Sequence, residues 1–311
     1  MLTQLAGLFC AAALALPLTL PKAPPRRAVS GSDVAIQMKN VDFRIADDIV
    51  LEIRALRGSL KPTRTGEPVT FDDVGSFDVT VDKAEIAVTP ESLGALMNSY
   101  VLGYQGSPIR NLSMEIDGDR IKQKGKLHKG IGIEFEIEGG LSANADGNIG
   151  MHADKIKAGH IPVKGLLHLF GDDLADLVKQ GTGRGMKVEG DDIILMPSAM
   201  TPPPDIHRRV TRVAIADGKI VQYMDSGLHL AALRPPLARD AYIYHRGGTL
   251  RFGKLTMRDA DLEIVGDRPG SFDFFQKQYR RQLVAGFLKS TASNGLIAHM
   301  ADYSHLHGQR K

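Results

Sequence analysis

Residues 77–101 read FDVTVDKAEIAVTPESLGALMNSYV, and the fold class can be worked out from this stretch. Apolar and polar residues alternate from Phe77 to Val81, which is the period of a half-buried strand. The apolar positions then change parity and continue from Ala84 to Val88. A change of parity inside one apolar run indicates a β-bulge, so the sequence predicts a single long, bulged strand.

A helix is predicted to follow this strand directly. Thr89 is a suitable N-cap, and Pro90 stands at the first helical position, where no backbone N–H is needed. The residues that follow carry an apolar stripe at helical spacing: Leu93, Leu96, Met97, Tyr100 and Val101. The quoted stretch is therefore a strand that leads into a short apolar helix.

Strand patterns flank this unit on both sides. On the N-terminal side, apolar and polar residues alternate from Val34 to Met38, from Val41 to Ile45 and from Ile49 to Ile53. On the C-terminal side, four alternating runs lie between residues 112 and 158, and pairs such as Asp117-Gly118 separate them. Glycine turns between alternating runs are typical of an antiparallel meander.

Two further helices and a second group of strands are predicted beyond the meander. The first helix starts near Pro162 and has a broad apolar face: Val163, Leu166, Leu167, Phe170, Leu174, Leu177 and Val178. Strand patterns then occupy residues 188–195 and several runs between 210 and 264. The last helix is expected after Gly270, with apolar residues at helical spacing: Phe272, Phe275, Tyr279, Leu283 and Phe287.

Helices that fall between runs of antiparallel strands predict an α+β fold. We expect a long, curved, mostly antiparallel sheet wrapped around the apolar helices. The expected organisation is a leader and linker (1–31), a domain (32–303) and a polar tail (304–311). The domain is either one unit or two packed halves, 32–198 and 205–303.

The N-terminal leader predicts export. An uncharged apolar run extends from Leu5 to Leu20 and is followed by the linker PKAPPRR, which is the pattern of a signal peptide. Lys22, Arg26 and Arg27 all follow the apolar run, as they would for an N-terminal anchor. Either interpretation places the protein in the periplasm or the cell envelope.

Composition and charge exclude several functional classes. The net charge is only +3 and no basic block is present, so no nucleic-acid partner is expected. The single cysteine, Cys10, lies in the leader, so the folded part has no thiol nucleophile and no cysteine metal ligand.

No motif in the chain predicts catalysis. Gly181–Gly185 resembles a phosphate-binding loop but lacks the G-K-[ST] ending, and it follows a predicted helix where the motif should follow a strand. A third alternative, an enzyme on envelope glycolipid or glycan, would need two carboxylates that converge in a cleft, such as Glu134 with Glu136 or Asp259 with Asp261. We expect a protein without catalytic residues, metal or cofactor.

The segments VTPESLGALMNSYV, NLSMEIDGDRIKQKGKL, GIEFEIEGGLSANADGNIGMHADKI and PVKGLLHLFGDDLADLV follow one another as helix, meander and apolar helix. In this order of elements, about residues 75 to 180 resemble bacterial envelope proteins of the tubular lipid-binding (TULIP-like) group and, more loosely, the AsmA-like lipid-transfer proteins. The resemblance implies a twisted sheet wrapped on a helix around a lipid-sized groove. It carries over no catalytic residues.

The resulting hypothesis is a protein that binds or transfers a lipid or another apolar molecule, with a membrane surface as a second partner. The expected ligand site lies between strand residues and the apolar faces of the helices: Ile133, Phe135 and Ile137 with Leu93, Leu96, Met97, Val101, Val163, Leu167, Phe170 and Leu174. The alternative is a structural or interaction protein whose core is filled by side chains and whose exposed sheet edge or loop binds an envelope partner.

Overall fold

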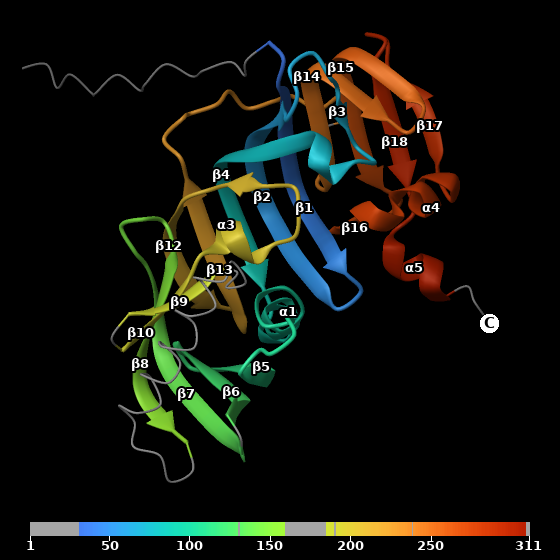
Figure 1. Cartoon of the computed structure of the whole chain (residues 1–311). Helices are drawn as coiled ribbons and strands as arrows, with labels where there is room; N and C mark the ends of the chain where they lie inside the picture. The colour runs from blue at the N-terminus through green and yellow to red at the C-terminus, as the bar shows by residue number, and fades with distance from the viewer. Residues whose placement is uncertain (1–30, 130, 159–184, 190, 238, 309–311) are drawn as a thin grey trace, which may run out of the picture.

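The structure is a computed structural model that describes residues 31–308 apart from 130, 159–184, 190 and 238 (Figure 1). Strands dominate the described chain and form two sheets, one large and curled, the other small. The mostly antiparallel, curled sheet is confirmed. The predicted helix over residues 162–178 lies outside the described residues.

The large sheet has twelve strands in the described chain. Its main path runs β12 (Val210–Ala216), β13 (Lys219–Asp225), β4 (Phe77–Val88), β2 (Ile49–Pro62), β1 (Val34–Ala46), β14 (Tyr242–Phe252), β15 (Leu255–Gly266), β18 (Leu296–Met300) and β17 (Phe287–Ser290). Along this path every neighbouring pair is antiparallel except β15 and β18. Segments from both ends of the chain therefore meet in one sheet.

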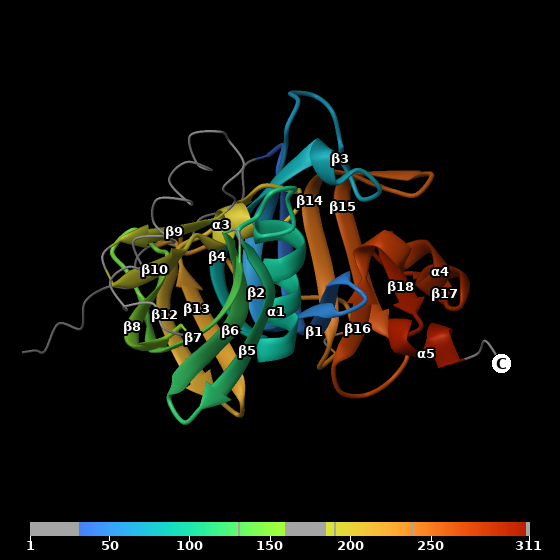
Figure 2. The same ribbon diagram turned by 60° about the horizontal axis from the view of Figure 1, so that its bottom comes forward.

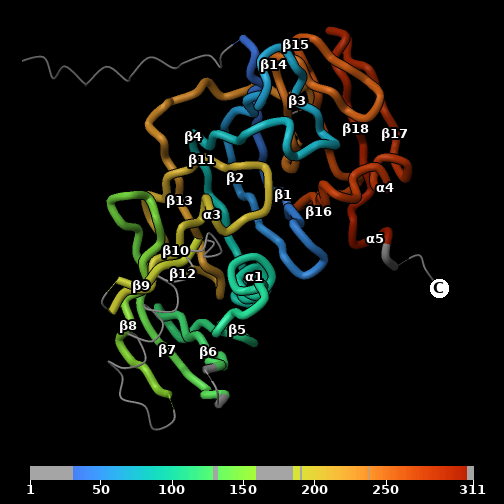
Figure 3. Tube along the Cα trace, in the orientation of Figure 1, coloured from blue at the N-terminus to red at the C-terminus, as the bar shows by residue number. Residues whose placement is uncertain are grey.

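Three short strands occupy sheet edges where a longer neighbour has ended. They are β3 (Val69–Thr70) on β14, β11 (Ile206–His207) on β4 and β16 (Phe272–Phe275) on β1, and all three pairings are parallel. Each supplies backbone partners that the long strand would otherwise lack. The segments that carry β3 and β11 cross in front of the large sheet in Figure 3.

The predicted bulge in β4 is confirmed. Val81 pairs with Gly58 and Lys83 with Arg57 on β2, so Asp82 is passed over in the ladder. Asp82 is fully buried on the opposite face, where its carboxylate accepts hydrogen bonds from the Ser226 hydroxyl at 3.1 Å and the Leu230 backbone N–H at 2.9 Å. The bulge thus fixes the connection between β13 and β14 to the outer face of the sheet.

The small sheet is an antiparallel set in the order β5 (Ile109–Asp117), β6 (Arg120–Lys129), β7 (Ile131–Ala143), β8 (Ile149–Lys157), β10 (Asp192–Leu195) and β9 (Met186–Glu189). The predicted meander is confirmed. The prediction of one strand over 188–195 is wrong: β9 ends at Glu189 and β10 begins at Asp192, because polar residues interrupt the apolar alternation there.

The predicted helix after β4 is confirmed as α1 (Pro90–Leu96), which continues as the π-helical turn η2 (Met97–Val101). The Thr89 hydroxyl accepts a hydrogen bond from the Ser92 N–H at 3.2 Å, as an N-cap should. The Asn98 amide bonds both backbone groups of Leu112 on β5, at 2.7 and 3.0 Å. This helix stands between the two sheets and joins them (Figure 2).

The prediction of a helix over residues 272–287 is wrong. Phe272–Phe275 form β16, a 3-10 turn η3 (Gln276–Gln278) and a short helix α4 (Tyr279–Val284) follow, and Phe287 begins β17. Pairing with β1 overrides the helical spacing, because the β16 residues all become buried there. Residues 303–308, most of which were expected in a polar tail, form helix α5 (Tyr303–Gly308).

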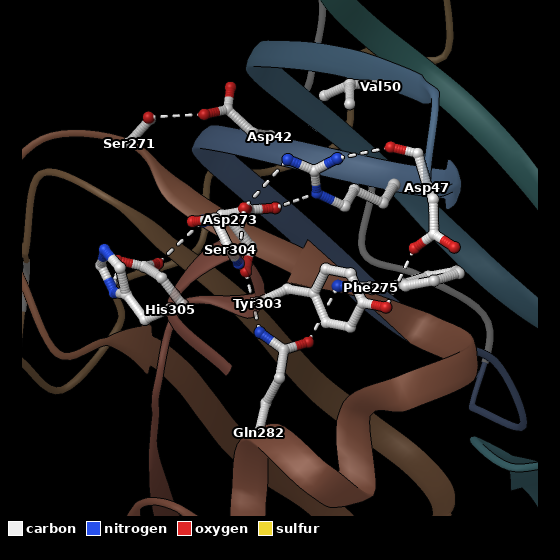
Figure 4. A network of polar contacts seen from close by, with 12 residues as sticks. Asp42, Asp47, Val50, Ser271, Asp273, Phe275, Gln282, Tyr303, Ser304 and His305 are labelled. Atoms are coloured by element: carbon white, nitrogen blue, oxygen red, sulfur yellow. Dashed lines mark hydrogen bonds and ion pairs between the residues drawn. The ribbon is translucent and has the colours of Figure 1, made fainter. Parts of the chain in front are cut away.

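A polar network holds this C-terminal region against β1 (Figure 4). Arg44 makes a bidentate ion pair with Asp273, with N–O distances of 2.6 and 3.1 Å. Gln282 is fully buried; its amide donates to the carbonyls of Asp273 and Ala301 and accepts from the Phe275 N–H, at 2.8 to 2.9 Å. A single side chain therefore satisfies three buried backbone groups.

Replacing Gln282 with alanine should lower the free energy of unfolding by about 1–3 kcal/mol, because it leaves these backbone groups buried without partners. Chemical denaturation of the purified protein measures the change. Gln278→Ala is the matched control, since the Gln278 side chain makes no capping hydrogen bond to α4. Equal stability of the two variants would show that the network does not anchor the C-terminal region.

Candidate functional site

A cavity of about 600 Å³ lies on the inner face of the large sheet, the face that carries Ile36, Leu56 and Val81. Its floor is formed by side chains of β1, β2, β4 and β14. Its other walls come from the segment around β3, from the proline-rich segment before β11 and from β16 with the start of α4. The same segments that occupy the sheet edges therefore border the cavity, which is partly open to solvent.

Irregular backbone positions in β1 and β4 keep the cavity floor apolar. On either side of such a position, apolar residues an odd number apart in sequence point to the same face. Ile36 and Phe43 both line the cavity and are an odd number of residues apart on β1. Between them Asn40 has a φ of 50°, a conformation that Asn tolerates better than most residues. The bulge at Asp82 likewise brings Val81 and Ile86 of β4 to the same face, although they are also an odd number of residues apart.

Aromatic rings close one end of the cavity. Phe71 is at their centre and contacts the rings of His245, Phe252, Phe274 and Tyr279 with centroid distances of 4.8 to 6.1 Å. All four contacts are edge-to-face, the arrangement that aromatic quadrupoles favour. This cluster gives the cavity a rigid apolar wall.

His245 is a neutral polar group in this wall. Its ring is 1% exposed, and its Nδ1 has no hydrogen-bond partner among the described residues. Burial lowers the pKa of His245 to about 4, so the imidazole is uncharged at neutral pH. It therefore adds no charge to the cavity.

More cations than carboxylates line the cavity. Among the described residues, they are one carboxylate and four cations: Asp72, Arg44, Arg208, Lys277 and Arg280. The Asp72 carboxylate accepts hydrogen bonds from the Tyr279 hydroxyl at 2.6 Å and Arg280 Nε at 3.0 Å. With Arg44 paired to Asp273, Arg208 and the exposed Lys277 remain without an acidic partner in the described chain.

Arg208 lies between β11 and β12 and is the most isolated of these cations. One guanidinium nitrogen donates to the Pro197 carbonyl at the start of α3 (Pro197–Met200). Its Nε is fully buried and has no partner among the described residues. Burial lowers the pKa of Arg208 to about 10, which still leaves the guanidinium charged at neutral pH.

A small chamber of about 40 Å³ adjoins the large cavity, and Thr201, Arg208, Leu51 and Ile86 line both. Three buried polar atoms without partners in the described chain belong to residues of the chamber wall: Thr201 Oγ1, Arg208 Nε and Gln222 Oε1. Buried polar groups are nearly always paired, so three such atoms around one void indicate a place for a polar guest.

The structure separates the residues that the sequence grouped into one site. Leu93 and Leu96 line the small chamber, whereas Phe135 and Ile137 line a different void of about 20 Å³ in the small sheet. Met97 and Val101 are buried, Ile133 is half-buried, and Val163, Leu167, Phe170 and Leu174 lie outside the described residues. The predicted helix and strand site therefore stays a prediction.

Sequence reasoning did not assign the large cavity or Arg208 to a site. Alternation in β1, β2 and β4 showed which side chains face inward, and this was the available signal for the floor. Arg208 stands in an unpatterned segment, TPPPDIHRRV, where nothing distinguishes it from the exposed Arg209.

The four carboxylates that the sequence offered as enzyme candidates do not line the cavity. Glu134 pairs with Lys126 at 3.1 Å, Glu136 with Lys157 at 3.0 Å and Asp259 with Arg246 at 2.9 Å. Asp261 accepts a hydrogen bond from the Tyr244 hydroxyl. Each of the four carboxylates thus has an ion-pair or hydrogen-bond partner on an adjacent strand.

Among the described residues, one group of potential metal ligands occurs at the C-terminal end: Asp267, Asp302 and His305 bring ligand atoms within 4.8 Å of one another. Asp302 already accepts a hydrogen bond from the Asp273 N–H at 2.9 Å, and Asp267 is exposed. This hydrogen bond accounts for the position of Asp302.

Exposed apolar residues gather at the edge strand β17, where Phe287 and Leu288 are 59% and 51% exposed. Val284 at the end of α4 is 86% exposed. An open sheet edge of the kind that the interaction hypothesis requires is thus present.

Comparison with protein-family models, with curated proteins and with solved structures finds no match for this chain. Within the part of the chain that the structure describes, no helix is long and apolar enough to cross a membrane. The function must therefore be argued from the site itself.

His245 should make stability depend on pH. Because its pKa is near 4 when folded and near 6.5 when unfolded, the unfolded state binds more protons in this range, and stability is lost as pH falls from 6.5 to 4. Denaturation curves between pH 7 and pH 4 should show a loss larger by on the order of 3 kcal/mol than in His245→Leu. His207→Gln, which changes an exposed histidine, is the control and should lose stability as the unaltered protein does. If the unaltered protein, His245→Leu and His207→Gln all showed the same dependence of stability on pH, the burial of a neutral His245 would be contradicted.

Proposed function

We propose that the protein binds or carries a lipid or another apolar ligand in the large cavity of its curled sheet. The observation that carries this proposal is the cavity of about 600 Å³, whose floor is apolar and whose charged groups are few. Its volume falls in the range of small-molecule sites, and its mixture of apolar walls with a few polar groups is typical of them.

The apolar floor of this partly open cavity supports a ligand over a filled core. Contiguous apolar surface that faces solvent often marks a ligand groove or an interaction site. The strands that line this cavity are irregular in ways that keep apolar side chains on its floor, as at Asn40 and Asp82. An apolar ligand would remove that surface from water, with a gain of roughly 25 cal/mol per Å² buried.

The leader is consistent with the same proposal. An exported protein of the periplasm or cell envelope works between membranes, where apolar molecules need a carrier. We therefore propose that the cavity serves transport or storage of such a molecule, with no catalytic step.

The proposal predicts that a bulky side chain in the cavity blocks binding without unfolding the protein. Val79 is half-buried on β4 and lines the cavity, so Val79→Trp should place its ring in the free space. We expect the affinity for the neutral fluorescent probe N-phenyl-1-naphthylamine to fall at least tenfold, as measured by fluorescence titration.

Leu255→Trp is the matched control, since Leu255 is 47% exposed and lies at the turn between β14 and β15, away from the cavity. It should bind the probe as the unaltered protein does, and thermal unfolding should show both variants folded. Undiminished binding by a folded Val79→Trp variant would place the probe elsewhere. A protein that does not bind the probe at all would favour the filled-core interaction protein.

A further inference from the structure

We propose that the ligand is an amphiphile with a small anionic head group, of the class of long-chain carboxylates, and that Arg208 binds this head group in the small chamber. This inference rests on the proposed function, because it names the class of molecule that the large cavity takes. It goes further in assigning a fixed orientation: head group in the chamber, chain in the cavity.

The isolation of Arg208 is the first step. Arg44 and Arg280 have counter-charges, Asp273 and Asp72, and Arg280 is also exposed. Lys277 is exposed, so water solvates it. Arg208 is half-buried with a fully buried Nε, and among the described residues it bonds the Pro197 carbonyl and no carboxylate. A cation removed from water without a counter-charge is costly, and an anionic ligand would supply that charge.

The convergence of unpaired groups is the second step. Arg208, Thr201 and Gln222 all line the chamber, and each has a buried polar atom without a partner in the described chain: Nε, Oγ1 and Oε1. A guanidinium N–H and a hydroxyl can donate to the two oxygens of a carboxylate. The Gln222 amide can present its NH₂ after a flip of the side chain, since its oxygen and nitrogen are assigned and not observed.

The size of the chamber selects the head group. At about 40 Å³ it has room for roughly three water-sized groups. A carboxylate has three heavy atoms, whereas a phosphodiester with its alcohol is considerably larger. The chamber therefore favours a carboxylate over a phospholipid head group.

The small chamber and the large cavity are neighbours. Leu51 and Ile86 form apolar walls of both the chamber and the large cavity, next to Thr201 and Arg208. A chain attached to a carboxylate in the chamber would pass these residues and continue along the apolar floor. The polar and apolar parts of one amphiphile thus match two neighbouring voids that share these four lining residues.

The test compares palmitate with 1-hexadecanol, which has the same chain length and no charge. Each displaces N-phenyl-1-naphthylamine from the full chain at pH 8, where palmitate is ionised. Four proteins are compared: the unaltered protein, Arg208→Gln, Arg208→Lys and, as a matched control at the exposed neighbouring residue, Arg209→Gln.

We expect palmitate to displace the probe at least tenfold more strongly than hexadecanol in the unaltered protein and in Arg209→Gln, because a charge-assisted hydrogen bond in a buried site contributes about that factor. Arg208→Gln should lose the preference and retain probe and hexadecanol binding, which also shows that it is folded. Arg208→Lys should restore part of the preference, since it retains the charge but not the guanidinium geometry.

Equal displacement by palmitate and hexadecanol in the unaltered protein would overturn this inference and leave the proposed function standing. Retained preference in Arg208→Gln would overturn the role of Arg208. Stronger displacement by hexadecyl phosphate than by palmitate would overturn the carboxylate assignment. If the unaltered protein takes up neither the probe nor palmitate, the proposed function fails together with the inference.

Discussion

The bulge at Asp82 is the constraint on which the arrangement of the site depends. A regular β4 would turn Val81 and Ile86 to opposite faces, because they are an odd number of residues apart. The bulge puts both on the cavity floor and directs Asp82 to the other face, where its carboxylate holds Ser226 and Leu230. Bulges also increase the local twist of a sheet, which agrees with the curled form seen in Figure 1. The apolar floor and the fixed outer segment are thus two consequences of one irregularity.

The two sheets meet where the site becomes polar. Helix α1 lies between them, and its residues Leu93 and Leu96 line the same chamber as Arg208. Thr201 and Gln222 reach the same chamber from the proline-rich segment and from β13. The chamber therefore combines side chains that are far apart in sequence, and the position of Arg208 depends on how the small sheet packs against the large one.

Much of the fold could be predicted from local sequence, and most of the site could not. Alternation located the long strands, the parity change in β4 located its bulge, and Thr89-Pro90 located the start of α1. The helix predicted over Phe272 to Phe287 was wrong, because the pairing with β1 and the Arg44–Asp273 ion pair are long-range contacts that leave no local pattern. Alternation also cannot tell whether an inward-facing side chain meets another side chain or a void, so it could not separate the cavity floor from the interior around Phe135, where the void is only about 20 Å³. An unpaired cation such as Arg208 becomes visible only when its neighbours are known.

The cavity of the curled sheet is proposed to hold an apolar or amphiphilic molecule. Native mass spectrometry of the protein without residues 1–31, followed by denaturing extraction and lipid analysis, shows whether it does. We expect a near-stoichiometric adduct that denaturation releases and that the extract identifies as a chain with a small acidic head group. A clean mass of the protein alone, before and after incubation with an excess of palmitate, would show that the cavity holds no such molecule.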